Sequence, residues 1–116
     1  MPRSTDAAMA TDVRTILLTA PDAETAERLG RVLVEERLAA CANVVPGVVS
    51  VFRWEGAVQR EAEALVIVKT VAARVEEVRA RVVELHPYDV PEVLVLPVLG
   101  GHAPYLAWVA EEVAET

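Results

Sequence analysis

The sequence predicts one α+β domain in which two helices cover one face of an antiparallel sheet, with a further helix at the C-terminal end. Its 116 residues leave room for a single domain. Strand and helix patterns follow one another in the order strand, helix, strand, strand, helix, strand, which is the split βαβ or ferredoxin-like arrangement. A compact turn separates the two middle strands, so we expect them to form a hairpin.

The N-terminal part of the chain predicts a tail, a strand and a helix. Residues 1–12 are small, polar and unpatterned, and we interpret them as a flexible tail before a single domain over residues 13–116. Residues 13–20 are almost entirely apolar, which is typical of a strand buried on both faces. Asp22 is a good N-cap for a helix ending near Leu38, because apolar residues then recur at helical spacing.

Two unusually long strands are predicted next, over residues 41–54 and 57–70, with Glu55-Gly56 as the turn between them. Arms of about 14 residues compare with a usual strand of five or six. At about 3.3 Å per residue, each arm would reach roughly 46 Å, whereas a compact chain of this length is about 35 Å across. Pro46-Gly47 is expected to form a bend or bulge, and the hairpin is expected to project from the domain.

The tip of this hairpin carries Phe52, Arg53 and Trp54. An exposed two-stranded ribbon with large aromatic side chains would invite aggregation in a monomer. A partner subunit that pairs with the ribbon removes this hazard. The geometry therefore predicts an oligomer in which Phe52, Arg53 and Trp54 contact a neighbouring chain.

The C-terminal half predicts a helix, a strand and a last helix. Apolar residues at helical spacing over residues 75–85 form the second amphipathic helix, which ends at His86 because Pro87 disfavours helical geometry before it. Residues 92–98 fit the fourth strand. Pro104 fits the first position of the last helix.

Composition excludes several classes of partner and compartment. The formal net charge is −7 and no cluster of Arg or Lys is present, so neither nucleic acid nor an anionic membrane is an expected partner. Cys41 is the single cysteine, which rules out an intrachain disulfide and fits a reducing compartment. No apolar run reaches the roughly 20 residues that a membrane helix needs. We expect a cytoplasmic protein.

A few side chains could carry chemistry. Cys41, His86 and His102 are the soft metal ligands of the sequence, but no two of them have the spacing of a local metal site. Cys41 fits a buried structural thiol, and His86 fits equally a cation at a helix end or a functional residue. No Gly-x-Ser-x-Gly motif is present and nothing orients a Cys41–His86 dyad, so we expect no enzymatic activity.

Lys69 and the aromatic residues outside the main apolar runs suggest a second kind of site. Lys69 is the only lysine and ends an apolar strand, where it either extends to the sheet edge or binds an anion. Tyr88, Tyr105 and Trp108 favour pocket walls or subunit contacts.

Seven short motifs, in order along the chain, resemble the CutA divalent-cation tolerance family. The resemblance covers about residues 13–114. The motifs are Arg37-Leu-Ala-Ala-Cys-Ala-Asn43, Phe52-Arg-Trp-Glu-Gly56, Val68-Lys-Thr70, His86-Pro-Tyr88, Val90-Pro-Glu92, Leu96-Pro-Val98 and Tyr105-Leu-x-Trp108.

The resemblance implies a ferredoxin-like fold and a homotrimer similar to the PII signalling proteins, in which long hairpins pair between subunits. It implies a non-enzymatic protein, with no required cofactor, that acts in tolerance of copper and other divalent cations. Copper is the expected ion because imidazole sites favour Cu²⁺ over other divalent ions.

The metal ligands implied by the resemblance carry over only in part. Members proposed to bind copper have a cysteine before Thr-Ala-Pro-Asp and two adjacent histidines before Pro-Tyr, and these positions are Leu18, Leu85 and His86 here. The expectation for this chain is therefore a different site, made by His86 with Cys41 and with carboxylates such as Glu61 from a neighbouring subunit.

Two other functions fit the same sequence. One is a PII-like regulatory trimer that binds a small anionic ligand at clefts between subunits, lined by Lys69, Tyr88, Tyr105 and Trp108. The other is a purely structural assembly module, which the length of the hairpin favours.

Overall fold

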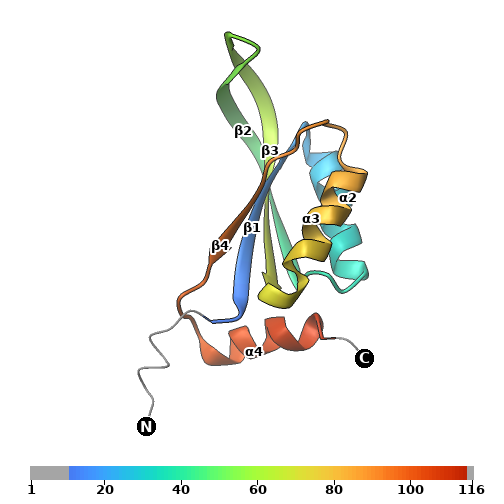
Figure 1. The fold of residues 1–116 in the computed structure, drawn as a ribbon, viewed down its shortest axis with the longest axis vertical. Coiled ribbons are helices and arrows are strands. Elements are labelled where there is room, and N and C mark those ends of the chain that lie inside the picture. The colour runs from blue at the N-terminus through green and yellow to red at the C-terminus, as the bar shows by residue number, and fades with distance from the viewer. Residues whose placement is uncertain (1–10, 115–116) are drawn as a thin grey trace.

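The fold is a four-stranded antiparallel sheet with helices on one face, seen in a computed structural model that describes residues 11–114 (Figure 1). The strand order is β2-β3-β1-β4, and each neighbouring pair is antiparallel. The strands are β1 (Val13–Ala20), β2 (Cys41–Trp54), β3 (Ala57–Val71) and β4 (Val93–Pro97). The predicted ferredoxin-like fold is confirmed.

Helices α2 (Ala23–Glu35) and α3 (Val75–Leu85) lie on the same face of the sheet, and α4 (Ala103–Glu112) crosses its lower end (Figure 1). A short 3-10 turn, Ala72–Arg74, connects β3 to α3. Asp22 caps α2 as predicted, since its carboxylate accepts a 2.7 Å hydrogen bond from the Thr25 N–H. Among the described residues, no helix has the length and apolar character needed to span a membrane.

Two helix boundaries differ from the sequence prediction. Helix α2 ends at Glu35 rather than near Leu38, because Arg37 adopts a left-handed φ of 60° and the Leu38 N–H turns back to the Leu33 carbonyl at 2.9 Å. Pro104 is the second residue of α4 rather than the first, since His102 occupies the N-cap position. Of the predicted tail, residues 1–10 lie outside the described residues, and Thr11 donates its N–H to the Val98 carbonyl at 3.0 Å.

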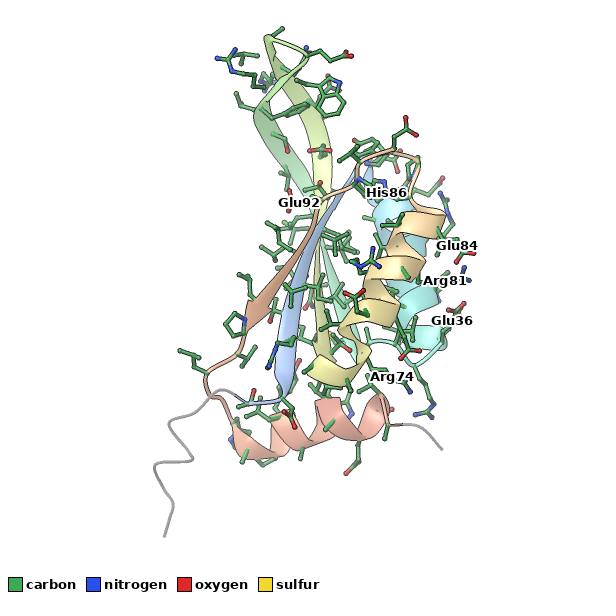
Figure 2. All side chains as sticks on the ribbon, in the orientation of Figure 1. Glu36, Arg74, Arg81, Glu84, His86 and Glu92 are labelled. Atoms are coloured by element: carbon green, nitrogen blue, oxygen red, sulfur yellow. The ribbon has the colours of Figure 1, made fainter. Side chains whose placement is uncertain are left out.

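The main core lies between the sheet and helices α2 and α3. Alternate residues of β1 and β3 and one side of α2 and of α3 meet there with exposures of 2% or less, among them Ile16, Leu18, Leu29, Leu33, Val66, Val68, Val78 and Val82. Arg81 of α3 holds the two helices together at the surface by donating to both carboxylate oxygens of Glu36, at 3.0 and 2.7 Å, and to Glu84 at 2.9 Å (Figure 2). A smaller core under α4 contains Val13, Ala40, Val109 and Val113.

The opposite face of the sheet is also apolar, and α2 and α3 do not cover it. Leu17 of β1 lies between Ile67 of β3 and Leu94 of β4 in the strand register, and their side chains point away from the main core. Leu94 and Leu96 are 53% and 43% exposed. A sheet in contact with water on one face normally alternates apolar and polar residues, so this face is suited to a further layer of protein.

The β2–β3 hairpin projects beyond the rest of the molecule as predicted (Figure 1). The molecule measures 54 × 29 × 22 Å and its radius of gyration is 15.7 Å, compared with about 13 Å for a compact chain of this length. Glu55 and Gly56 form the turn with φ angles of 50° and 82°. A register shift between Val45 and Val48 marks the bulge at Pro46-Gly47, where Gly47 has a φ of 74°.

Candidate functional site

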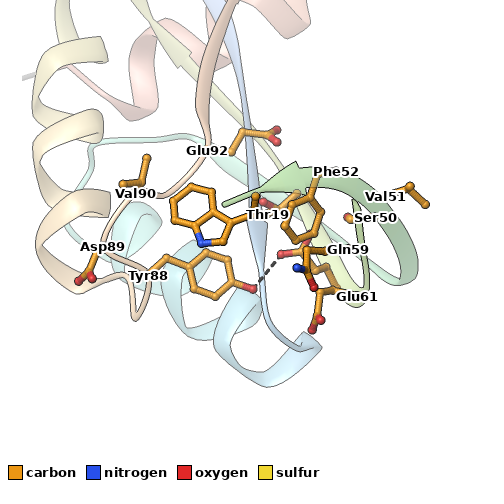
Figure 3. Close-up of a pocket in the computed structure, with 12 residues that line it drawn as sticks. Thr19, Ser50, Val51, Phe52, Gln59, Glu61, Tyr88, Asp89, Val90 and Glu92 are labelled. Carbon is orange, nitrogen blue, oxygen red and sulfur yellow. Dashed lines mark hydrogen bonds between the residues drawn. The ribbon is translucent and has the colours of Figure 1, made fainter. Parts of the chain in front are cut away.

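A cleft of about 690 Å³ lies between the projecting hairpin and the loop of residues 88–92 (Figure 3). Three segments that are far apart in the sequence form most of its wall: β2, β3 and the loop of residues 88–92. The end of β1 contributes Thr19. The side chains that define its chemistry are Phe52, Trp54, Glu61, Glu63, Tyr88, Asp89 and Glu92.

Strand alternation places the hairpin side chains in the cleft. Residues two apart on a strand share a face, so Phe52 and Trp54 point the same way. The register pairs Phe52 with Gln59 and Ser50 with Glu61, which brings the aromatic and acidic side chains of the two strands onto that face. Phe52 is 39% exposed and Trp54 is 51% exposed, so both rings are accessible to a partner or ligand.

His86 anchors the loop of the cleft to the sheet. Its side chain is buried, and its Nδ1 accepts a hydrogen bond from the Tyr88 N–H at 3.0 Å. The proton of the neutral ring is therefore on Nε2, which donates to the Thr19 carbonyl at 2.7 Å. Both ring nitrogens are occupied, so a metal ion could bind His86 only by displacing one of these bonds.

Tyr88 connects the loop to the hairpin. Its hydroxyl donates to Glu63 Oε2 at 2.8 Å (Figure 3), and its ring lies 4.7 Å from that of His86. Burial raises the pKa of Tyr88 to about 12, with further contributions from the hydrogen bond to Glu63 and from the charges of Glu63, Glu61 and Asp22. The phenol therefore stays protonated at neutral pH and holds the Glu63 carboxylate in place.

The charge of the cleft is negative. Glu61, Glu63, Asp89 and Glu92 line it, and no Lys or Arg is among its described lining residues. Within residues 11–114, however, no three His, Cys, Asp or Glu side chains converge closely enough to hold a metal ion. The cleft therefore suits a positively charged ligand and disfavours an anion, but a single chain offers no complete metal centre.

The three residues predicted to bind metal do not meet within one chain. His86 and Glu61 lie near the upper end of the sheet. Cys41 of β2 pairs with Lys69 of β3, and Lys69 pairs in turn with Thr15 of β1. Thr15 is four residues along β1 from Thr19, whose carbonyl contacts His86, so Cys41 and His86 lie at different ends of the sheet. Cys41 is partly exposed rather than buried, which corrects the structural-thiol interpretation. Of the two family ligand positions occupied by leucine, Leu18 is fully buried in the core and Leu85 is 37% exposed.

The residues predicted to line a ligand cleft divide into two places. Tyr88 lies in the acidic cleft. Lys69 lies at the other end of the sheet, where its ammonium donates to Asn43 Oδ1. Tyr105 of α4 contacts Cys41 nearby. Burial raises the pKa of Tyr105, and the charge of Cys41 and a hydrogen bond to Cys41 raise it further. The ring of Trp108 lies 5.6 Å from that of Tyr105.

The sequence pattern singles out only part of the cleft. The hairpin prediction placed Phe52 and Trp54 at an exposed tip, and Glu61 was a predicted ligand. Asp89 and Glu92 lie in a loop with no periodicity after His86-Pro87. Glu92 falls within the motif Val90-Pro-Glu92, whereas only its place beside a tyrosine could have drawn attention to Asp89.

The ferredoxin-like sheet and the long hairpin define a class of small α+β proteins in which a two-stranded ribbon projects from the domain. The chain matches the CutA1 divalent ion tolerance protein family over residues 14–112. It is 46% identical to the divalent-cation tolerance protein CutA of Thermus thermophilus, over 83% of this chain and 93% of that protein. The crystal structure of CutA from Xylella fastidiosa matches with a TM-score of 0.88 at 41% identity, over 90% of this chain and 100% of that one.

A plant relative is longer. The chloroplastic protein CutA 1 of Oryza sativa is 43% identical over 87% of this chain, and the matched part spans 57% of the length of the plant protein. The chain with this fold and cleft belongs to the CutA divalent-cation tolerance family. The family is named for ion tolerance and not for a reaction.

Proposed function

We propose that this protein is a non-enzymatic, cytoplasmic homotrimer that acts in tolerance to divalent cations by binding them between its subunits. Family membership supports the role in cation tolerance. The main support for an oligomer is the apolar sheet face that contains Leu17, Ile67 and Leu94, which neither α2 nor α3 covers. A second copy of the chain is the partner that is always present to cover it.

The geometry of the hairpin favours a ring of subunits over an open chain. The arm of one subunit extends beyond its own domain and reaches the next, which is a head-to-tail contact. Such contacts form a closed ring when the rotation between subunits allows it. A trimer closes after three contacts and leaves no exposed arm with Phe52 and Trp54 in water.

Sedimentation tests the assembly. At low micromolar concentration we expect a single species of three times the 12.6 kDa chain mass. Ile67→Glu introduces a charge on the uncovered face and should give a folded monomer, because a buried unpaired carboxylate strongly disfavours the contact. Glu76→Gln, on the exposed side of α3, is the matched control and should remain trimeric. A wild-type protein that sediments as a monomer would contradict the proposal.

For the cation, we propose that Glu61 is one ligand and that a neighbouring subunit completes the metal site. Glu61 makes no hydrogen bond or ion pair among residues 11–114, whereas both nitrogens of His86 are occupied and Cys41 lies at the other end of the sheet. Copper is the first ion to test, because sites with N, O or S ligands bind Cu²⁺ more tightly than the other first-row divalent ions.

Calorimetry with Cu²⁺ tests this binding. The trimer should give saturable heat, and Glu61→Gln should weaken the affinity by at least about tenfold, whereas Glu76→Gln should leave it unchanged. His86→Ala should lower the melting temperature, because it leaves the partly buried Thr19 carbonyl and Tyr88 N–H without their side-chain partner. Heat no greater than that of a chelator-matched blank would favour a purely structural assembly.

A further inference from the structure

We infer that the hairpin of one subunit enters the cleft of the next subunit, where its Arg53 and Arg60 pair with two carboxylates of the loop of residues 88–92. These carboxylates belong to Asp89 and Glu92. The inference rests on the proposed homotrimer, and it adds the two surfaces through which each subunit contacts the next.

The hairpin presents two different faces. Phe52 and Trp54 face the cleft of their own subunit, so the alternate residues of each strand face away from it. Val51 borders the cleft, but its side chain points away from the other lining residues (Figure 3). The outer face of the hairpin, as we call this second face, consists of three pairs of residues opposite each other in the register: Val49 with Ala62, Val51 with Arg60 and Arg53 with Val58.

The outer face of the hairpin carries two cations without a counter-charge. Arg53 and Arg60 are exposed, and neither makes a hydrogen bond or ion pair among residues 11–114. They are diagonal neighbours across the two strands, about 7–8 Å apart, so their like charges repel unless a carboxylate approaches. Val51 and Val58 beside them are 68% and 64% exposed. Apolar side chains next to unpaired arginines are typical of a surface that another protein covers.

The cleft offers the complementary surface. Asp89 and Glu92 are exposed, and within the described part of the chain they too make no hydrogen bond or ion pair. Phe52 and Trp54 line the same cleft, so a hairpin that enters it covers both rings and brings its guanidinium groups near carboxylates and aromatic faces. Two arginines meet two carboxylates, which leaves Glu61 for the cation of the proposed function.

A second copy of the chain is the partner that fits both surfaces. The outer face of the hairpin and the cleft lie on opposite sides of the same ribbon, so they do not meet within one chain. A contact between two unlike surfaces of identical chains is head-to-tail, and it closes into a ring when the rotation allows. Because the chain has a net charge of −7, two arginines at the end of the hairpin also direct that end toward the acidic cleft of a neighbour.

Sedimentation over a range of protein concentrations, which gives the dissociation constant of the trimer, tests the inference. Arg53→Glu with Arg60→Glu should raise this constant at least about tenfold, since like charges then face each other in the contact. Asp89→Arg with Glu92→Arg should have the same effect from the other side of the contact. Arg79→Glu, on the exposed side of α3, is the matched control and should leave the dissociation constant unchanged.

A variant that combines the two charge reversals in one chain separates a direct contact from general damage. All four substitutions together should restore most of the lost affinity, because every contact in the ring again joins opposite charges. The inference is wrong if the hairpin variant assembles as tightly as the wild type, or if the combined variant assembles no more tightly than either half. A monomeric wild type would overturn the proposed trimer itself, whereas a trimeric wild type with an insensitive hairpin would overturn this inference alone.

Discussion

At the scale of single residues, His86 shows how a structure assigns a role that local sequence leaves open. The sequence allows a helix-end cation or a functional imidazole. In the structure the ring is buried and neutral, with one nitrogen donating to Thr19 and the other accepting from Tyr88. Its role is to fix the loop that forms one wall of the cleft, and that role depends on a strand 67 residues earlier in the chain.

Asp22 provides a test of stability at acid pH. Hydrogen bonds from Thr25, chiefly from its backbone N–H, hold the pKa of Asp22 below its ordinary value. The folded state therefore binds this proton less readily than the unfolded state, whose pKa is about 3.9. The stabilisation is complete above the unfolded pKa and is lost as pH falls through the folded pKa.

Asp22→Asn should keep the cap at neutral pH, because asparagine caps helices about as well as aspartate. Below about pH 4, the variant should lose less stability than the wild type, as measured by urea unfolding across the pH range. If both proteins lose the same stability as the pH falls, the charge of the Asp22 cap does not contribute to the free energy of unfolding.

The two tyrosines provide a test at alkaline pH. The pKa of Tyr88 is raised to about 12 and that of Tyr105 is raised as well, in both cases chiefly by burial. Stability contributed by the Tyr88 phenol is present below the unfolded pKa of about 10 and is lost as pH rises toward 12. In Tyr105→Phe, ultraviolet titration should show one phenol ionising near pH 12. A midpoint near 10 would mean that the Tyr88 phenol is neither buried nor bonded to Glu63.

At the scale of elements, the contact between α2 and β2 depends on a glycine. Gly30 is buried, and a Cβ at this position would lie 2.9 Å from the Cβ of Ala42. The Cβ of Ala42 is attached directly to the strand backbone and cannot move aside alone. The helix therefore approaches the sheet closely because residue 30 has no side chain.

Gly30→Ala should lower the free energy of unfolding by about 1 kcal/mol, since crowding of about 1–3 kcal/mol outweighs a helix-propensity gain of about 1 kcal/mol. Thermal unfolding should show a fall of roughly 4–8 °C. Gly100→Ala is the matched control, because a Cβ at residue 100 would have no other atom within 4 Å, and it should change little. A Gly30→Ala protein more stable than the wild type would mean that α2 can shift away from β2 without a loss of packing energy.

The hairpin and the helix ends show what local pattern predicts well and what it predicts poorly. The Glu55-Gly56 turn and the bulge at Pro46-Gly47 were predicted because turn residues act through their own backbone geometry. The end of α2 was misplaced because Arg37, a residue with no turn preference, takes the left-handed conformation that closes the helix.

At the scale of the whole molecule, the uncovered sheet face links stability to concentration. If the folded chain is stable only within an oligomer, its melting temperature rises with protein concentration. Calorimetric scans over a hundredfold range of concentration should show this rise for the wild type. The melting temperature of Ile67→Glu should be lower and independent of concentration. A wild-type melting temperature that does not change with concentration would contradict obligate assembly.

The sequence by itself determined the elements, their order and the projecting ribbon. These depend on side-chain periodicity and turn residues, which act over a few neighbouring positions. Only the tertiary structure decided which side chains share a site. It joined Tyr88 to Glu63, 25 residues away, and it placed Cys41 and His86 at opposite ends of the sheet. Strand register sets such distances, and register depends on packing across the whole sheet rather than on any local pattern.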